Sequence, residues 1–176
     1  MKKAKISFSS DHFSINREDL DEAGKMAEEY FELNQNPDQI PATEENGDWI
    51  FHNIPEYINI IRKDGKIIGY AFLLPCNNEL MEKFLKKKIN EAKLFEKIKK
   101  LKFKGIPETI YLCASFLRKE FRGLGLATTA FIKMINKITQ NGKNKITLFC
   151  WIYSSDGEKL AKRIANTTGF ELRNRM

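Results

Sequence analysis

A short turn between two apolar segments carries the residue types of an anion-binding site: Arg122-Gly123-Leu124-Gly125-Leu126-Ala127-Thr128. The apolar run 109–117 before it indicates a buried strand, and the apolar spacing of residues 130–138 after it indicates a helix. The first N–H groups of a helix lack partners within the helix and lie at the positive end of its dipole. Glycine permits positive φ and lets a ligand approach the backbone closely. The turn therefore predicts a seat for a phosphate or pyrophosphate, with Arg122 as a charged second contact.

Two other nucleotide-binding motifs fit this turn less well. The phosphate-binding loop of ATPases needs Gly-Lys-Ser/Thr, which the chain lacks. The dinucleotide-binding pattern needs a third glycine where Thr128 stands, and an acidic residue near positions 147–148, which are Thr and Leu. The alternative that the glycines only form a tight strand–helix connection stays open at this point.

Length and composition predict one soluble domain spanning residues 1–176. The chain is 42% hydrophobic and 30% charged, as is usual for globular proteins. No apolar run approaches the ~20 residues of a membrane-spanning helix. The basic start lacks the apolar core, about 7–15 residues long, of a signal peptide. We therefore expect no membrane partner, and the cytoplasm is the natural compartment.

The cysteines and histidines argue against a metal site. Cys76, Cys113 and Cys150 are an odd number without Cys-x-x-Cys spacing, which favours buried reduced thiols. The only histidines are His12 and His52, so a metal centre is not expected.

Charge is distributed unevenly along the chain. Residues 1–50 carry 12 acidic and 5 basic side chains, whereas residues 51–176 carry 11 acidic and 25 basic ones. The first segment therefore favours a cationic partner and the second a polyanion, unless both are merely solvated surfaces.

The remaining patterns predict alternating strands and helices. In chain order we expect a strand at 4–9, a helix at 17–33 capped by Ser14 or Asn16, and a polar loop at 34–48 that could contain one helical turn. Hairpin strands at 57–62 and 66–74 and a strand at 109–117 follow. The last elements are a helix ending near 139, a strand at 145–153, a helix at 156–168 capped by Ser154 or Ser155, and a short edge strand at 170–172. Asp64-Gly65 predicts the hairpin turn, Pro75 is expected to end the second hairpin strand, and Gly169 to end the last helix. Mixed strands with interspersed helices make this an α/β or α+β domain.

A lysine-rich segment lies between the third and fourth strands. Residues 77–104 contain ten lysines and four glutamates, with apolar residues at helical spacing, and fit one long helix or two shorter ones. Such a segment can dock nucleic acid or another acidic partner. Its phenylalanines fit an apolar helix face better, so we favour a solvated helical insert that covers the sheet.

With this order in place, the chain resembles the GNAT superfamily of N-acetyltransferases. The turn Arg122–Ala127 satisfies that family's Arg/Gln-x-x-Gly-x-Gly/Ala pattern, and Gly169-Phe170 matches its recurrent Gly-Phe after the last helix. The hairpin strand with Gly69-Tyr70-Ala71-Phe72 is similar too. The resemblance covers residues 55–74 and 108–171 well. It implies a mixed, mostly antiparallel sheet of about six strands flanked by helices.

The resemblance also implies a site for acetyl-CoA as acyl donor. Backbone N–H groups of residues 123–128 (Gly123, Leu124, Gly125, Leu126, Ala127 and Thr128) would hold the pyrophosphate beside Arg122. Ser115, Phe116 and Leu117 would pair with the pantetheine arm, in a gap where the strands 109–117 and 145–153 splay apart. The N–H of Leu117 would polarise the acetyl carbonyl, and lysines such as Lys119 could screen the nucleotide phosphate.

The implied reaction is direct attack of a primary amine on the thioester. Many members use as acid a tyrosine four residues before Gly-Phe, where this chain has Ala165. Tyr153 is the best substitute, although a tyrosine packed at the rim is an equal alternative. Glu108 or water could accept the amine's proton, and Glu158 stands nearest to a frequent family asparagine. The loss of the usual tyrosine motivates a second hypothesis, a catalytically idle acyl-CoA-binding regulatory module.

The acceptor is harder to predict. The acidic first segment favours a cationic small-molecule or protein amine, bound by carboxylates among Asp38, Glu44, Glu45 and Asp48 beside Trp49 or Phe51. A hydrated acidic loop is the alternative. The sequence leaves a monomer and a homodimer equally open.

Overall fold

The computed structural model describes residues 5–12, 15–32 and 35–176. Within them, six strands form one sheet in the order β1-β2-β3-β4-β5-β6. The strands are β1 (Ile6–Phe8), β2 (Ile58–Lys63), β3 (Lys66–Cys76), β4 (Thr109–Leu117), β5 (Thr147–Trp151) and β6 (Glu171–Arg175). The pairs from β1 to β4 are antiparallel, and the pairs β4–β5 and β5–β6 are parallel. The expected mixed, mostly antiparallel sheet is confirmed.

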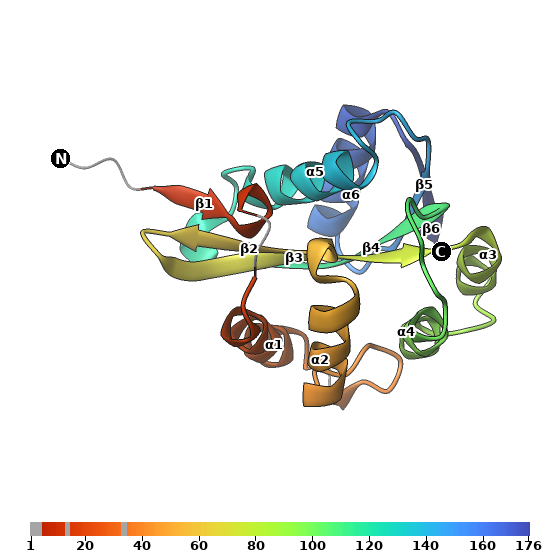
Figure 1. The fold of residues 1–176 in the computed structure, drawn as a ribbon, viewed down its shortest axis with the longest axis horizontal. Helices are drawn as coiled ribbons and strands as arrows, with labels where there is room; N and C mark the ends of the chain where they lie inside the picture. Colours follow the sequence, from red (N-terminus) through yellow and green to blue (C-terminus); the bar gives the residue numbers. More distant parts are fainter. Residues whose placement is uncertain (1–4, 13–14, 33–34) are drawn as a thin grey trace.

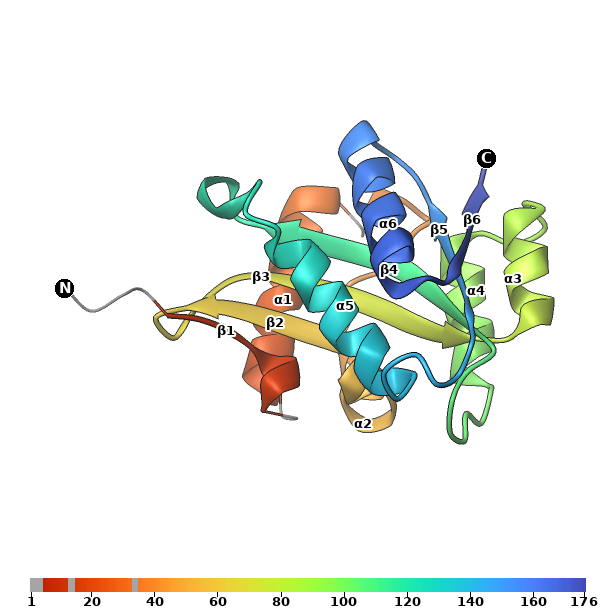
Figure 2. The same ribbon diagram turned by 90° about the horizontal axis from the view of Figure 1, so that it is seen from above.

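Helices cover both faces of the sheet (Figure 1). They are α1 (Arg17–Phe31), α2 (Glu44–Asn53), α3 (Asn78–Leu85), α4 (Glu91–Lys99), α5 (Leu126–Ile138) and α6 (Ser155–Thr168), with short 3-10 turns at Ser9–Asp11, Pro55–Tyr57 and Lys119–Phe121. α5 and α6 lie on one face, and α1, α2 and α4 on the other. Figure 2 shows α5 and α6 crossing the same side of the strands.

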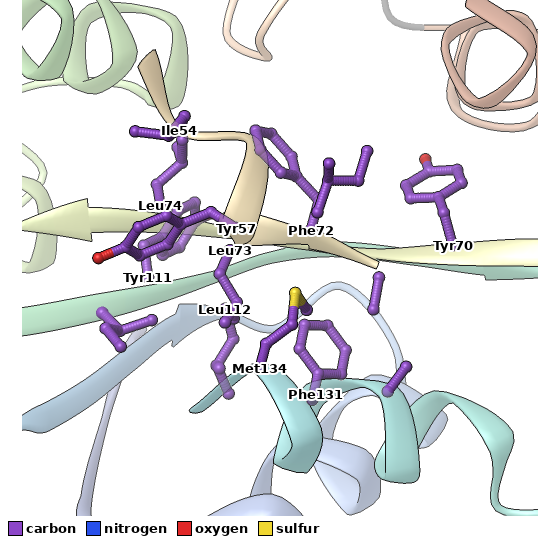
Figure 3. Close-up of a cluster of buried hydrophobic side chains, with 14 of the residues drawn as sticks. Ile54, Tyr57, Tyr70, Phe72, Leu73, Leu74, Tyr111, Leu112, Phe131 and Met134 are labelled. Atoms are coloured by element: carbon purple, nitrogen blue, oxygen red, sulfur yellow. The ribbon is translucent and has the colours of Figure 1, made fainter. Parts of the chain in front are cut away.

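The core is built on strand alternation. Leu73 and Leu112 point toward Phe131 and Met134 of α5, whereas Phe72 lies on the opposite face (Figure 3). All five side chains are buried.

Local signals at the element ends are largely confirmed. Asp64 and Gly65 adopt positive φ (49° and 84°), as the hairpin turn requires. The Asn16 side chain caps α1, and the Ser154 side chain accepts from Gly157 N at the start of α6. Gly169 ends α6 with φ of 73°. The alternative cap Ser14 lies outside the described residues.

Two expectations about where elements begin or end are wrong. The predicted loop 34–48 contains the start of α2, whose Thr43 cap accepts from Asn46 N at 3.2 Å. Asn46 Nδ2 in turn donates to Pro41 O at 2.9 Å and fastens the preceding loop. Pro75 does not end β3, which continues to Cys76. β2 pairs with β3 only as far as Phe72, so one edge of β3 is free beyond it and tolerates a residue without an N–H.

The lysine-rich insert forms two helices rather than one. α3 and α4 bury apolar side chains against the sheet, among them Phe84, Leu94, Phe95 and Ile98. Strand 145–153 is shorter than expected, at Thr147–Trp151, and the edge strand is longer, at Glu171–Arg175.

Candidate active site

β5 separates from β4 about halfway along β4. β4 pairs with β5 only from Thr109 to Leu112, so its residues 113–117 have no partner in β5. On the other side, β4 remains paired with β3 as far as Leu117. Leu73 opposes Leu112 and Phe72 opposes Ala114, so Cys113 is an extra, bulged residue where the strands part. β4 thus offers a free backbone edge beside its last five residues.

The glycine turn leads from this free edge into α5. Gly123 and Gly125 adopt positive φ (77° and 74°), and Gly125 occupies the N-cap position. No side chain caps α5, so the first N–H groups of the helix remain available to an anion. A Cβ at either glycine would meet no atom within 4 Å, so backbone conformation, not space, explains the glycines.

Arg122 lies against the free edge. Its Nε donates to Leu117 O at 2.9 Å. Its guanidinium carbon lies 5.4 Å from the Tyr30 ring centroid and 5.9 Å from that of Phe116. The side chain is exposed, so its charge can reach an anion at the turn.

One cavity of about 1420 Å³ connects these features. It is lined by α1, the loop before α2, the free edge of β4, the glycine turn, the end of β5 and the start of α6. Nine of the ten residues expected to bind the donor line it: Ser115, Phe116, Leu117, Arg122, Gly123, Gly125, Leu126, Ala127 and Thr128. Leu124 does not line it, and its side chain is 65% exposed. The volume exceeds the roughly 300–1,000 Å³ of usual ligand pockets.

Tyr153 lines the same cavity just beyond β5. Its ring lies 4.4 Å from that of Trp151 and is more than half exposed. Loss of solvent around the hydroxyl, followed by the charge of Glu91, raises the pKa of Tyr153 above its ordinary value. The phenol therefore keeps its proton at neutral pH and can donate it to a stronger base.

Three other positions singled out from the sequence lie away from the cavity. Ala165 is buried on α6, and its carbonyl accepts from Gly169 N. Glu158 pairs with Lys162 at 2.6 Å. Glu108 precedes β4 at the end opposite the free edge, where its carboxylate accepts from Asn78 N at 2.8 Å. The structure does not bring Glu108 to the reacting region.

The acidic residues expected to bind the acceptor are mostly engaged elsewhere. Asp48 pairs with Arg17 at 2.8 Å, Glu45 lies 4.0 Å from Lys99, and Asp38 accepts from Asn90 Nδ2 at 3.0 Å. Only Glu44 of the four lines the cavity. Trp49 packs edge-on against Phe95 and Phe51 against His52, so neither forms a cavity wall.

Sequence reasoning missed Glu91, the first residue of α4. This carboxylate lines the cavity although its residue is only 5% exposed. Its Oε1 accepts from Tyr111 Oη at 2.7 Å and its Oε2 from Ile40 N at 3.3 Å. Burial raises the pKa of Glu91, opposed by both hydrogen bonds and the charge of Arg175. Glu91 stands three, four and seven residues before Leu94, Phe95 and Ile98, so the helical spacing places it on the apolar face of α4. A charged residue on that face was the signal that could have identified it.

Cys113 lies beside this carboxylate, with its Sγ 4.0 Å from Glu91 Oε1. Burial and the neighbouring charge hold the pKa of Cys113 well above its ordinary value. The group is therefore a neutral thiol and a poor nucleophile.

The described residues include no cluster of three or more His, Cys, Asp or Glu side chains suited to a metal ion. Among the helices of the described ranges, none is long and apolar enough to cross a membrane.

The parallel strands β4 and β5 part beside the glycine-rich start of α5, and one cavity runs past both features. The model of the acetyltransferase (GNAT) family matches residues 23–161. The chain therefore belongs to this family and is an acyl-CoA-dependent N-acetyltransferase.

A solved structure supports the fold. The chain is similar to a ribosomal-protein-alanine N-acetyltransferase from Brucella melitensis biovar Abortus 2308, with a TM-score of 0.51 and 14% identity over 92% of this chain and 91% of that one. A second structure, described as an acetyltransferase, has a TM-score of 0.45 and 18% identity over 93% and 87% of the two chains. No curated protein matches the chain in sequence.

Proposed function

We propose that this protein transfers the acetyl group of acetyl-CoA to a primary amine by direct attack of the neutral amine on the thioester. The observation that carries the proposal is the continuity of one cavity, which runs from the glycine turn along the free edge of β4 to the end of β5. Bound acetyl-CoA supplies the activated acetyl group.

The glycine turn and the free edge of β4 fit the two ends of this donor. The uncapped N–H groups that begin α5, with Arg122 beside them, suit a pyrophosphate. Arg118 N donates to Ile68 O of β3, so the N–H of Leu117 points to the opposite, free edge. An N–H there can donate to the acetyl carbonyl oxygen and stabilise the negative charge that develops on it.

Tyr153 is the proposed acid. It lies at the end of β5, across the gap from the free edge of β4, and it holds its proton at neutral pH. A phenol in this place can protonate the leaving thiolate, the role that Ala165 cannot fill.

Thiol release tests the activity. The protein is incubated with acetyl-CoA and, separately, with spermidine, an aminoglycoside and a lysine-containing peptide, and free thiol is recorded. We expect acceptor-dependent release with at least one amine. Thermal stabilisation by acetyl-CoA without release for any amine would favour the idle binding module instead.

Reversing one charge tests the donor site. Arg122→Glu removes a cation that can form charge-assisted hydrogen bonds to phosphate and adds repulsion, so acetyl-CoA affinity should fall by about 10- to 100-fold. Lys143→Glu makes the same charge change in an exposed turn outside the cavity and serves as control. Equal thermal shifts by acetyl-CoA for both variants and the parent would refute the assignment of the turn.

A further inference from the structure

Three segments that are far apart in sequence meet at the β5 end of the cavity: Gln39 before α2, Glu91 at the start of α4, and Tyr153 after β5. We call this group the acceptor end. Its members share two properties, because all line the cavity and each presents a side-chain oxygen.

Glu91 is a buried carboxyl group with no buried cation paired to it in the described part of the chain. The titratable groups that face it are Tyr70 of β3, Tyr111 and Cys113 of β4, and Tyr153, all of which are neutral at neutral pH. The charge of Arg175 on β6 also acts on Glu91, but the Arg175 guanidinium stacks 4.3 Å from the Trp151 ring centroid and donates to Ile89 O. No ion pair involves Glu91 among the described residues.

Gln39 adds a buried oxygen that, unlike those of Glu91, has no hydrogen-bond partner within the described ranges. Its Oε1 is buried and accepts no hydrogen bond from any described residue. Its backbone neighbour Ile40 donates to Glu91, and the Gln39 side-chain amide opposes the rise in the pKa of Tyr153. A buried carbonyl oxygen without a hydrogen-bond donor destabilises the protein until a ligand supplies a donor.

We propose that the carboxylate of Glu91 and the carbonyl of Gln39 dock the amino group of the acceptor, and that Glu91 removes its proton. The inference rests on the proposed function and names the acceptor chemistry at that site. A primary ammonium fits because it brings a positive charge and three N–H donors to two buried oxygen acceptors.

The proton balance closes with the groups present. One proton moves from the ammonium to Glu91 Oε, which leaves a neutral amine and an uncharged carboxylic acid. As the C–N bond forms and the C–S bond breaks, the nitrogen loses a second proton and Tyr153 gives its proton to the departing sulfur. Tyr153 regains a proton from the nitrogen, and Glu91 returns its own to water.

Burial supports this role. Because its pKa is raised, the ionised Glu91 carboxylate is a stronger base toward an ammonium than the carboxylate of a surface glutamate. The rate should fall as pH drops through the pKa of Glu91, because the protonated acid accepts no proton.

Substitution of Glu91 by Gln is the main test. Glu91→Gln should lower kcat/KM for the best amine of the thiol-release panel by about 100-fold or more, the scale of general-base catalysis, and should remove the acid limb of the pH profile. Glu91→Asp keeps a carboxylate and should recover part of the rate. Gln39→Leu should raise KM for the amine by about 10-fold, the scale of a hydrogen bond to a charged group, with a smaller change in kcat.

Glu96→Gln is the control, since Glu96 lies on the same helix, pairs with Lys99 at 2.6 Å and does not line the cavity. It should leave the rate unchanged. Stabilisation by acetyl-CoA should be equal in all four variants and the parent, which shows that the donor site is intact.

The outcomes separate the two proposals. Suppose that the parent turns over an amine and that kcat/KM of Glu91→Gln stays within about threefold of the parent's. This change is far smaller than the effect of a lost general base, so it would overturn this inference and leave the proposed function standing. If the parent releases no thiol with any amine, the proposed function fails. The inference is then decided by calorimetric titration of n-butylamine with CoA present: binding lost in Glu91→Gln supports it, and equal or absent binding overturns it.

Discussion

Tyr153 and Glu91 have opposite tasks in this account, although burial raises the pKa of both. The raised pKa of the phenol keeps it protonated and able to act as an acid. The raised pKa of the carboxylate makes it a better base. Pairs of neighbouring groups whose environments suit one to give and the other to take a proton are typical of acid–base sites.

Removing the Tyr153 hydroxyl should slow the chemistry and spare the fold. We expect Tyr153→Phe to lower kcat by about 10- to 100-fold, at the lower end of acid catalysis. Stability should change by less than about 0.5 kcal/mol, because the side chain is more than half exposed. Thiol-release kinetics and thermal unfolding measure the two effects. A rate equal to that of the parent would assign Tyr153 to the rim alone.

Glu91 should also make stability depend on pH. The raised folded-state pKa means that the folded protein holds a proton which the unfolded chain releases. The contribution of Glu91 to the free energy of unfolding is therefore greatest below the ordinary carboxyl pKa and is lost as pH rises through the raised value. Urea unfolding of the parent and Glu91→Gln from about pH 4 to about pH 8 brackets this window. As pH rises, the parent should lose stability relative to the variant. A stability difference that does not change with pH would contradict the raised pKa of Glu91.

At the scale of elements, the contact between β3 and β4 positions the free edge of β4. A Cβ at Gly69 would lie 2.2 Å from Phe116 O and 3.1 Å from Leu117 Cα. Glycine at this place therefore lets β4 approach β3 along the residues that form the free edge. Its role is space, since Gly69 is absent from the positive-φ glycines.

Gly69→Ala should damage stability and donor binding together. We expect the free energy of unfolding to fall by about 1–3 kcal/mol from overpacking, and the affinity for acetyl-CoA to fall as residues 115–117 shift. Ile61→Val, in buried β2, should lower the free energy of unfolding by a comparable ~1 kcal/mol without changing the free edge of β4. Equal acetyl-CoA affinity in the two variants would show that this approach does not position the donor.

The sequence predicted the elements whose signals are local. Asp64-Gly65, the run 109–117 and Gly169 each carry their own turn or strand chemistry, and the structure confirms them. The full extent of α2 was not predicted, because Pro37, Pro41 and Gly47 suggested a loop with room for one helical turn. The bond from Asn46 to Pro41 O fastens that loop to the helix. Such a bond is not visible in a composition pattern.

For the whole molecule, the proposed donor and acceptor halves of the site differ in how the sequence encodes them. The proposed donor half is one continuous stretch, residues 115–128, so its pattern could be found in the sequence. The acceptor end joins Gln39, Glu91 and Tyr153, which only the packing of the insert against the sheet brings together. The lysine-rich insert thus covers the sheet and delivers a carboxylate to the cavity.

Transfer of a labelled acetyl group tests the central claim most directly. Acetyl-CoA carrying ¹³C in both acetyl carbons is incubated with the protein and the amine that gives the fastest thiol release, and the amine is then analysed by mass spectrometry. We expect a labelled acetyl group on nitrogen, formed in the same molar amount as the free thiol. Thiol release without labelled amine, or no release at all, would contradict it.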